Sequence, residues 1–185
     1  GWFAAAGPVD IVIANAGLAD SAPLTRTTLE VWTEMLAVNL TGVFLTLREG
    51  VRQMRDREWG RLITIASTAG LKGYPYLAAY VASKHGLIGL TRALAAEYAD
   101  KGVTVNAICP GWVLTPLVQK QIDDRARKEG ISVEQAKINL LAEKQPSLQF
   151  TTPEELGELA VFLCGPASGN IRGAAWVMDG GWSAQ

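Results

Sequence analysis

The stretch VDIVIANAG, residues 9–17, decides the fold, because it joins a short apolar run to a tight turn. Residues 9–14 are β-branched or apolar at nearly every position, which is typical of a parallel strand buried on both faces. Two similar runs follow, LITIA at 62–66 and VTVNAI at 103–108. The first run therefore predicts a sheet that buries it among parallel neighbours.

Helical patterns separate these runs. An amphipathic pattern begins at a cap at Thr27 or Thr28 and extends past Leu47, and a second one covers about 80–98. Thr152-Pro153-Glu154-Glu155 is a strong helix start, and a last strand is expected at 174–178. Strands that alternate with crossover helices predict an α/β fold, a doubly wound, Rossmann-like parallel sheet.

One segment does not fit this alternation. Residues 117–144 read as two polar helical pieces broken at Gly130, and the second opens with a capping box from Ser132 to Gln135. We interpret 112–150 as a lid over the substrate region, within a single domain that spans 1–185.

Composition excludes several classes of protein. The chain has 185 residues, 49% of them apolar, with 17 Lys and Arg against 18 Asp and Glu, which argues against binding to nucleic acid or an anionic membrane. No apolar run is long enough to cross a membrane. Cys109 and Cys164 lack the spacing of a metal site or a disulfide framework, so we expect no metal and a cytoplasmic location.

Tyr80 and Lys84 lie four residues apart, which on a helix places a phenol and an ammonium on the same face. A nearby cation stabilises phenolate and would lower the pKa of Tyr80, although such a pair alone is weak evidence for catalysis. Ser67 follows a predicted strand, as do Asn15-Ala16-Gly17 and Pro110-Gly111. These groups are expected at the carboxyl edge of the sheet, where ligands bind. His85 points away from Lys84, and we assign it no role.

With Asn39 and the terminal Asp179-Gly180-Gly181, these motifs resemble the short-chain dehydrogenase/reductase family over essentially the whole chain. The resemblance implies an NAD(P)-dependent enzyme that interconverts a secondary alcohol and a ketone. In it, Tyr80 would be the general acid/base, Lys84 would lower the pKa of Tyr80 and hold the nicotinamide ribose, Ser67 would orient the carbonyl, and Asn39 would hold a water in the proton relay. The structural alternatives are a backbone-bonded Asn39 and a turn-capping Ser67.

The resemblance also implies NAD as cofactor, with NADP as the alternative. Its expected contacts are Asn15, Ala16, Gly17, Tyr80, Lys84, Pro110, Gly111, Val113 and Thr115. Members of the family begin with three strands and a glycine-rich turn, about 70 residues that have no counterpart here. We expect this chain to be a fragment whose 9–14 strand becomes an exposed edge, with poor solubility and little cofactor affinity when made alone.

Within the family, the lid is most similar to that of bacterial (R)-3-hydroxybutyrate dehydrogenases. Of the four positions that hold the substrate carboxylate there, only Gln121 is matched, and the others are Ala19, Ala69 and Leu77, which cannot donate side-chain hydrogen bonds. This predicts a more apolar pocket for a larger or uncharged substrate. Trp112 and Trp182 are candidate pocket walls, or alternatively core or subunit-contact residues.

Two other functions remain open from the sequence. A 3-oxoacyl thioester reductase would share every catalytic motif, and a non-catalytic assembly protein could keep the fold alone. Helices from Thr28 and from Tyr80 carry more apolar surface than one sheet should need, and the resemblance implies that such helices pair across subunits. We therefore expect a homotetramer that acts on a small molecule.

Overall fold

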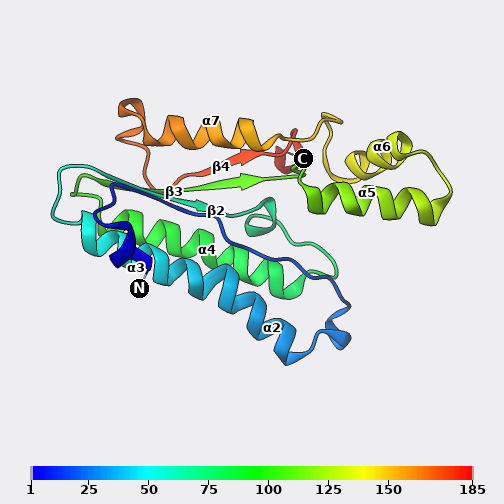
Figure 1. Cartoon of the computed structure of the whole chain (residues 1–185), viewed down its shortest axis with the longest axis horizontal. Helices are drawn as coiled ribbons and strands as arrows, with labels where there is room; N and C mark the ends of the chain where they lie inside the picture. Colours follow the sequence, from blue (N-terminus) through cyan, green and yellow to red (C-terminus); the bar gives the residue numbers. More distant parts are fainter. Residues whose placement is uncertain (1, 185) are drawn as a thin grey trace.

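The computed structural model describes residues 2–184 and contains one four-stranded parallel sheet (Figure 1). The sheet order is β1-β2-β3-β4, and each neighbouring pair is parallel. The strands are β1 Ile11–Ala14, β2 Gly60–Ile65, β3 Val103–Pro110 and β4 Ala175–Met178. The predicted doubly wound α/β architecture is confirmed.

Helices cover both faces of the sheet (Figure 1). On one face, α3 (Val43–Met54) and α4 (Ala78–Glu97) bury Leu47 and Leu87 against the side chains of β2 and β3. On the other, α7 (Pro153–Cys164) buries Leu163 against the same two strands. The expected capping box starts α7, since Thr152 and Glu155 exchange both hydrogen bonds. The central strands are therefore enclosed, and their carboxyl ends form the accessible edge.

β1 lies at the edge of the described sheet, paired only with β2. Val12 and Ala14 are buried, whereas Ile11 and Ile13 are 43% and 46% exposed. The prediction that this strand is buried on both faces was wrong for the chain as described. The expectation of an exposed apolar edge is confirmed.

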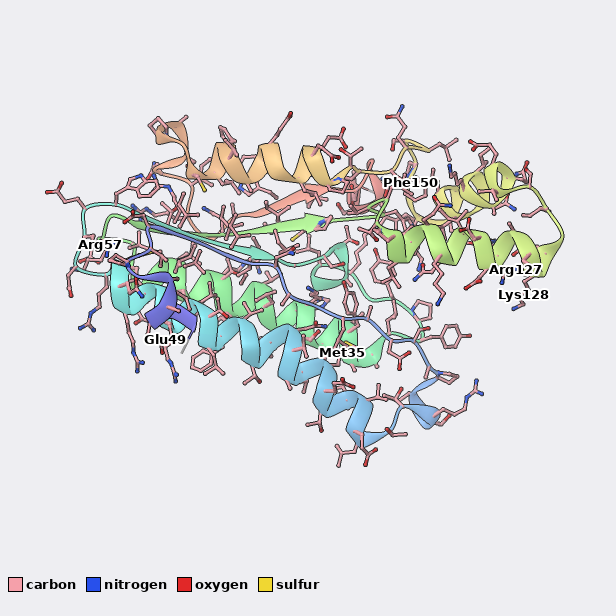
Figure 2. All side chains as sticks on the ribbon, viewed as in Figure 1. Met35, Glu49, Arg57, Arg127, Lys128 and Phe150 are labelled. Atoms are coloured by element: carbon pink, nitrogen blue, oxygen red, sulfur yellow. The ribbon has the colours of Figure 1, made fainter. Side chains whose placement is uncertain are left out.

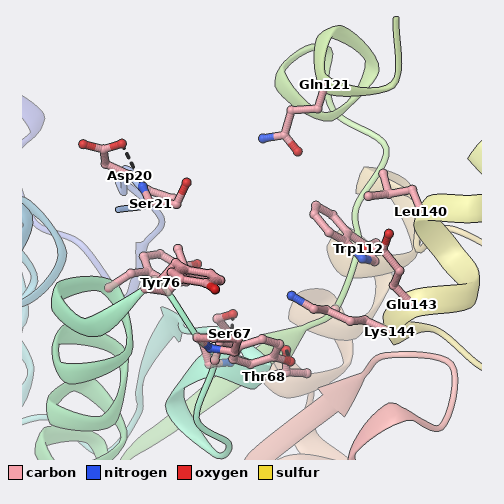
Figure 3. Close-up of a pocket in the computed structure, with 17 residues that line it drawn as sticks. Asp20, Ser21, Ser67, Thr68, Tyr76, Trp112, Gln121, Leu140, Glu143 and Lys144 are labelled. Atoms are coloured by element: carbon pink, nitrogen blue, oxygen red, sulfur yellow. Dashed lines mark hydrogen bonds between the residues drawn. The ribbon is translucent and has the colours of Figure 1, made fainter. Parts of the chain in front are cut away.

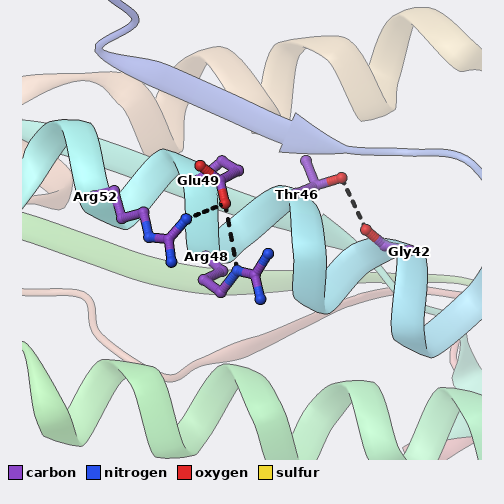
Figure 4. Close-up of polar contacts among 5 residues, drawn as sticks. All are labelled: Gly42, Thr46, Arg48, Glu49 and Arg52. Atoms are coloured by element: carbon purple, nitrogen blue, oxygen red, sulfur yellow. Dashed lines mark hydrogen bonds and ion pairs between the residues drawn. The ribbon is translucent and has the colours of Figure 1, made fainter. Parts of the chain in front are cut away.

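The first long helix is not regular. Thr28 caps α2 (Leu29–Leu36), as predicted, but a π-helical turn at Ala37–Gly42 separates α2 from α3. After this turn, Thr46 Oγ1 donates to the Gly42 carbonyl at 2.8 Å, and Arg48 and Arg52 hold Glu49 on the surface (Figure 4). Hydrophobic periodicity predicts a helix here but does not reveal the wider turn, which shifts the face on which following residues lie.

Two further helices project beyond the carboxyl ends of the strands, α5 (Pro116–Glu129) and α6 (Val133–Lys144) (Figure 1). The predicted break is confirmed, because Gly130 adopts a left-handed conformation with φ of 66°. Ser132 caps α6, but the side chain of Gln135 donates to Asn139, so only half of the expected capping box forms. The two helices bury an apolar cluster of their own, which consists of Val118, Ile122, Ala126, Ala136 and Leu140.

The remaining elements are short. They are α1 Trp2–Ala6 and the 3₁₀ turns Leu24–Arg26, Thr68–Gly70, Pro166–Ser168 and Trp182–Ala184. Cys109 and Cys164 are free thiols. Within residues 2–184, none of the helices combines the length and apolarity that a membrane span requires.

Candidate active site

Three predicted site residues converge beside the end of β1. A Cβ atom built on Gly17 would lie 3.3 Å from Asn39 Oδ1 and 3.6 Å from Lys84 Nζ. Lys84 reaches this point from α4, and its ammonium donates to the Ile65 carbonyl, the last of β2, at 3.0 Å. The absence of a side chain at Gly17 therefore leaves space directly beside a buried amide and a buried ammonium.

Asn39 lies in the π-helical turn and is fully buried. Its Oδ1 accepts from the Leu18 amide at 2.9 Å, and its Nδ2 donates to the Leu18 carbonyl at 2.8 Å. Nδ2 also lies 3.2 Å from Ser83 Oγ on α4. Asn39 thus connects the segment after the β1 turn to α4. In this conformation its side chain is hydrogen-bonded to the backbone, which is the structural alternative given for it above.

Ser67 follows β2 and caps the 3₁₀ turn Thr68–Gly70, where its Oγ accepts from the Ala69 amide at 3.1 Å. The turn packs closely against α4, since a Cβ atom on Gly70 would lie only 2.7 Å from the Lys84 carbonyl oxygen. Ser67 and Tyr80 line the same cavity, and the Ser67 side chain is close enough to the phenol to affect its pKa. Ser67 therefore caps this turn and also lies beside the Tyr80 phenol.

The pKa of Tyr80 does not shift in the direction expected from the sequence. Burial raises the pKa of Tyr80, while the hydrogen bond with Ser67 lowers it in part and the charge of Tyr74 adds to the increase. Burial also lowers the pKa of Lys84 to about 8, and the Lys84 ammonium lies 5.6 Å from the Tyr80 ring centroid. The predicted lowering of the Tyr80 pKa by Lys84 is therefore not found in this arrangement, because burial is the main cause of the shift and Lys84 is not among its causes.

A cavity of about 720 Å³ opens in front of Ser67 and Tyr80, between the strand ends and the α5–α6 pair (Figure 3). Five of the six predicted substrate residues line it, namely Ala19, Ala69, Leu77, Trp112 and Gln121. The sixth, Trp182, is not among its lining residues. Its ring lies 5.0 Å from Lys72 Nζ instead, and its carbonyl accepts from that ammonium at 2.9 Å.

Sequence reasoning missed much of the polar lining. The cavity is also bounded by Asp20, Ser21, Thr68, Tyr74, Tyr76, Glu143 and Lys144. Lys144 and Glu143 come from the last turn of α6, in the segment interpreted from the sequence as a lid, where neither residue was assigned a role at the site. A signal was available in the break at Gly130, which predicts that α6 folds back toward the strand ends. The lining does not support the expectation of a more apolar pocket.

The expected cofactor contacts fall into two groups. Asn15, Ala16 and Gly17 are exposed beyond β1. Across the edge, Gly111 packs tightly, with a Cβ atom there lying 2.7 Å from Gln145 Oε1, and Pro110 ends β3. Val113 forms a parallel bridge with Thr151, and Thr115 Oγ1 caps α5. Within residues 2–184, no cluster of His, Cys, Asp and Glu could hold a metal ion.

Comparisons with known proteins agree with this geometry. Residues 3–183 match a family model described as enoyl-(acyl carrier protein) reductase. The chain is 55% identical to D-beta-hydroxybutyrate dehydrogenase of Cupriavidus necator, a match that covers 97% of this chain and 69% of that relative. It is 40% identical to acetoacetyl-CoA reductase of Rhizobium meliloti, over 95% of this chain and 68% of that one. A variant of actinorhodin polyketide ketoreductase, solved with NADPH, has a TM-score of 0.89 and 34% identity, over 99% of this chain and 70% of that chain.

Proposed function

Because the chain belongs to the short-chain dehydrogenase/reductase family of oxidoreductases, we propose that it interconverts a small 3-hydroxy acid and the corresponding 3-keto acid with NAD(P). One observation carries this proposal. Ser67 and Tyr80 line the wall of the same cavity, close enough for the Ser67 side chain to lower the pKa of the phenol, with the Lys84 ammonium 5.6 Å from the phenol ring. A hydroxyl or carbonyl oxygen placed between the two hydroxyl groups would be oriented and protonated or deprotonated there.

The side chains divide the work. In oxidation, Tyr80 in its phenolate form would take the proton of the substrate alcohol. In reduction, the Tyr80 hydroxyl would return that proton, and in both directions the Ser67 hydroxyl would donate to the same oxygen. Lys84, with a pKa of about 8, can carry a proton to or from this site near neutral pH. Asn39 acts as a positioning residue here, because both ends of its amide hold Leu18. The proposed relay water at Asn39 remains a prediction.

The residues present fit a nicotinamide cofactor. Asn15–Gly17 offer an exposed surface without a side chain at Gly17, and the Lys84 ammonium beside it can donate to a sugar hydroxyl. A bound cofactor would supply the acceptor or donor of hydride. We propose NAD as the preferred form, with NADP as the alternative, since the ketoreductase above was solved with NADPH.

The substrate class rests on two supports. The relative named D-beta-hydroxybutyrate dehydrogenase is 55% identical to this chain over the 179 aligned residues, and the cavity lining includes one cation, Lys144, and the Gln121 amide. The alternative, a 3-oxoacyl thioester reductase, is supported by the relative named acetoacetyl-CoA reductase. The larger or uncharged substrate expected from the sequence has no support in this lining.

Steady-state kinetics test the proposal. We expect D-3-hydroxybutyrate with NAD⁺ to give a higher kcat/KM than any thioester or simple secondary alcohol in a panel, followed by absorbance of the reduced cofactor. The comparison is made with acetoacetyl-CoA and NADPH in the reductive direction. A kcat/KM for the thioester that exceeds the value for the acid would overturn the substrate assignment in favour of the alternative.

We further propose that residues 112–150 act as the lid and that the enzyme assembles as a homotetramer. α3 exposes Phe44 and Leu45 at 42% each, which supports subunit contacts along this helix. Light scattering on the purified enzyme would show the mass of four subunits. The variant Phe44→Glu should shift that mass downward, and a monomer in the unaltered protein would contradict the assembly.

A further inference from the structure

Lys144 is the last residue of α6 and lines the cavity from the side of the lid. Its Nζ lies 4.6 Å from the centroid of the Tyr74 ring. The Tyr74 hydroxyl is 2.8 Å from Thr68 Oγ1, and Thr68 directly follows Ser67. Figure 3 shows the Lys144 amino group pointing into the cavity on the side of Ser67 and Thr68. The Lys144 ammonium, on the α5–α6 lid, thus lies next to the floor of the cavity. This floor is formed at the strand ends by Ser67, Thr68 and Tyr80, where the proposed chemistry takes place.

The acidic residues of the cavity do not neutralise this cation. Glu143 is bound by Arg125, with Arg125 Nη1 and Glu143 Oε1 2.7 Å apart. Asp20 is exposed and accepts from the Ser21 amide at 2.7 Å. For Lys144, no carboxylate of residues 2–184 lies within ion-pair distance of Nζ. An ammonium that faces a cavity with only an aromatic ring as partner is a binding group for an anion.

The rest of the wall explains why one cation would be needed. Ala19, Ala69 and Leu77 line the same cavity and offer no side-chain donors, so a substrate carboxylate would find none there. Gln121, from α5, adds one amide. Among the described lining residues, the one ammonium and the one side-chain amide therefore both come from the α5–α6 pair.

We propose that Lys144 binds the carboxylate of the substrate and determines the specificity for acids, an inference that rests on the proposed function. The ammonium stands in for donors that positions 19, 69 and 77 lack. It has three N–H groups on a flexible stem, so it can follow the carboxylate as α6 approaches the floor. Binding energy for the acid group then comes from the lid, while the hydroxyl end is held by Ser67 and Tyr80.

The test compares an acid with its neutral counterpart, D-3-hydroxybutyrate and D-3-hydroxybutyramide, in Lys144→Met, Lys144→Gln and Lys144→Arg. We expect Lys144→Met and Lys144→Gln to raise KM for the acid by about 10- to 100-fold with little change in kcat, as a lost contact to a charged group predicts. KM for the amide should change by less than about twofold. Lys144→Arg should restore most of the affinity for the acid.

Lys128→Met is the matched control. Figure 2 places Lys128 at the far end of α5, away from the cavity, and its replacement removes the same charge from the lid without touching the site. Suppose that the unaltered enzyme oxidises the acid, but that the ratio of KM for the acid to KM for the amide is unchanged in both Lys144→Met and Lys144→Gln. That result would overturn the inference. An equal loss with both substrates would overturn it too, since it indicates a structural role. If the unaltered enzyme oxidises neither compound, it is the proposed function that fails.

Discussion

The strand ends and the α5–α6 lid differ in how they are built. The strand ends are held by long-range hydrogen bonds from buried polar side chains, such as Lys84 to the Ile65 carbonyl and Asn39 to Leu18. The lid is held by a small apolar cluster of its own, separate from the cores that enclose the sheet. The groups proposed to carry out the reaction thus face a separately packed unit that carries the groups proposed to bind the substrate carboxylate.

This difference indicates how a protein with this fold can change its substrate specificity and keep the same reaction. Ser67 and Tyr80 sit on elements that also form the main core, so moving them would disturb the sheet. Lys144 and Gln121 sit on helices whose packing depends mostly on one another. We infer that substitutions at the floor alter kcat, whereas substitutions on the lid alter KM.

The largest effect should come from the floor. Tyr80→Phe removes the hydroxyl that transfers the proton and keeps the ring over which the Lys84 ammonium lies. We expect kcat to fall by about 10³-fold, within the range for loss of a general acid/base, with KM nearly unchanged. Single-turnover measurements of cofactor reduction would show it. Tyr76→Phe, at another tyrosine of the same cavity, is the control and should keep kcat within a few-fold.

A lid substitution should give the next largest effect. Ile122 is fully buried in the lid cluster, so Ile122→Ala is expected to cost about 2–5 kcal/mol of lid stability. We expect faster amide hydrogen exchange in 116–144 and a higher KM, with exchange in β2 and β3 unchanged. Leu47→Ala, in the core beneath the sheet, should instead speed exchange in the strands. Equal effects of the two variants on strands and lid would contradict the separation of the two units.

How much could be predicted from the sequence follows the same division. The strands at 62–66 and 103–108 were found within two residues, because fully enclosed parallel strands leave continuous apolar runs. Ser67, Tyr80 and Lys84 were found because strand ends and helical spacing fix where such side chains meet. The π-helical turn at Ala37–Gly42 was not found, since its single extra residue leaves the apolar pattern almost unchanged.

The missed residues have a common physical reason. Lys144 ends a polar helix, and polar residues there are indistinguishable in sequence from a solvated surface. Its role depends on how α6 folds back, which is a tertiary property that no local pattern encodes. The direction of the Tyr80 pKa was missed for a related reason. Burial of the phenol is the main cause of its raised pKa, and it comes from packing, which the spacing between Tyr80 and Lys84 does not encode.

The smallest expected effect tests whether the buried Lys84 ammonium at the strand ends lowers the stability of the protein. Lys84 is 4% exposed, and burial lowers its pKa from 10.5 to about 8. Between these values the unfolded chain binds more protons than the folded one, so this group makes stability rise with pH from about 8 to 10.5. Below pH 8 the buried ammonium costs stability, and Lys84→Met should therefore raise the free energy of unfolding at pH 7 by about 1–3 kcal/mol.

Urea denaturation at pH 7 and at pH 10, with the unaltered enzyme as reference, measures this difference. The gain in Lys84→Met should shrink toward pH 10, where the lysine of the folded protein is already neutral. Lys72→Met is the control, because its ammonium lies at the Trp182 carbonyl rather than beside the Tyr80 ring. A Lys84→Met variant that is less stable than the unaltered enzyme by the same amount at pH 7 and at pH 10 would contradict this prediction, because it would show that the side chain supports the strand ends independently of its charge.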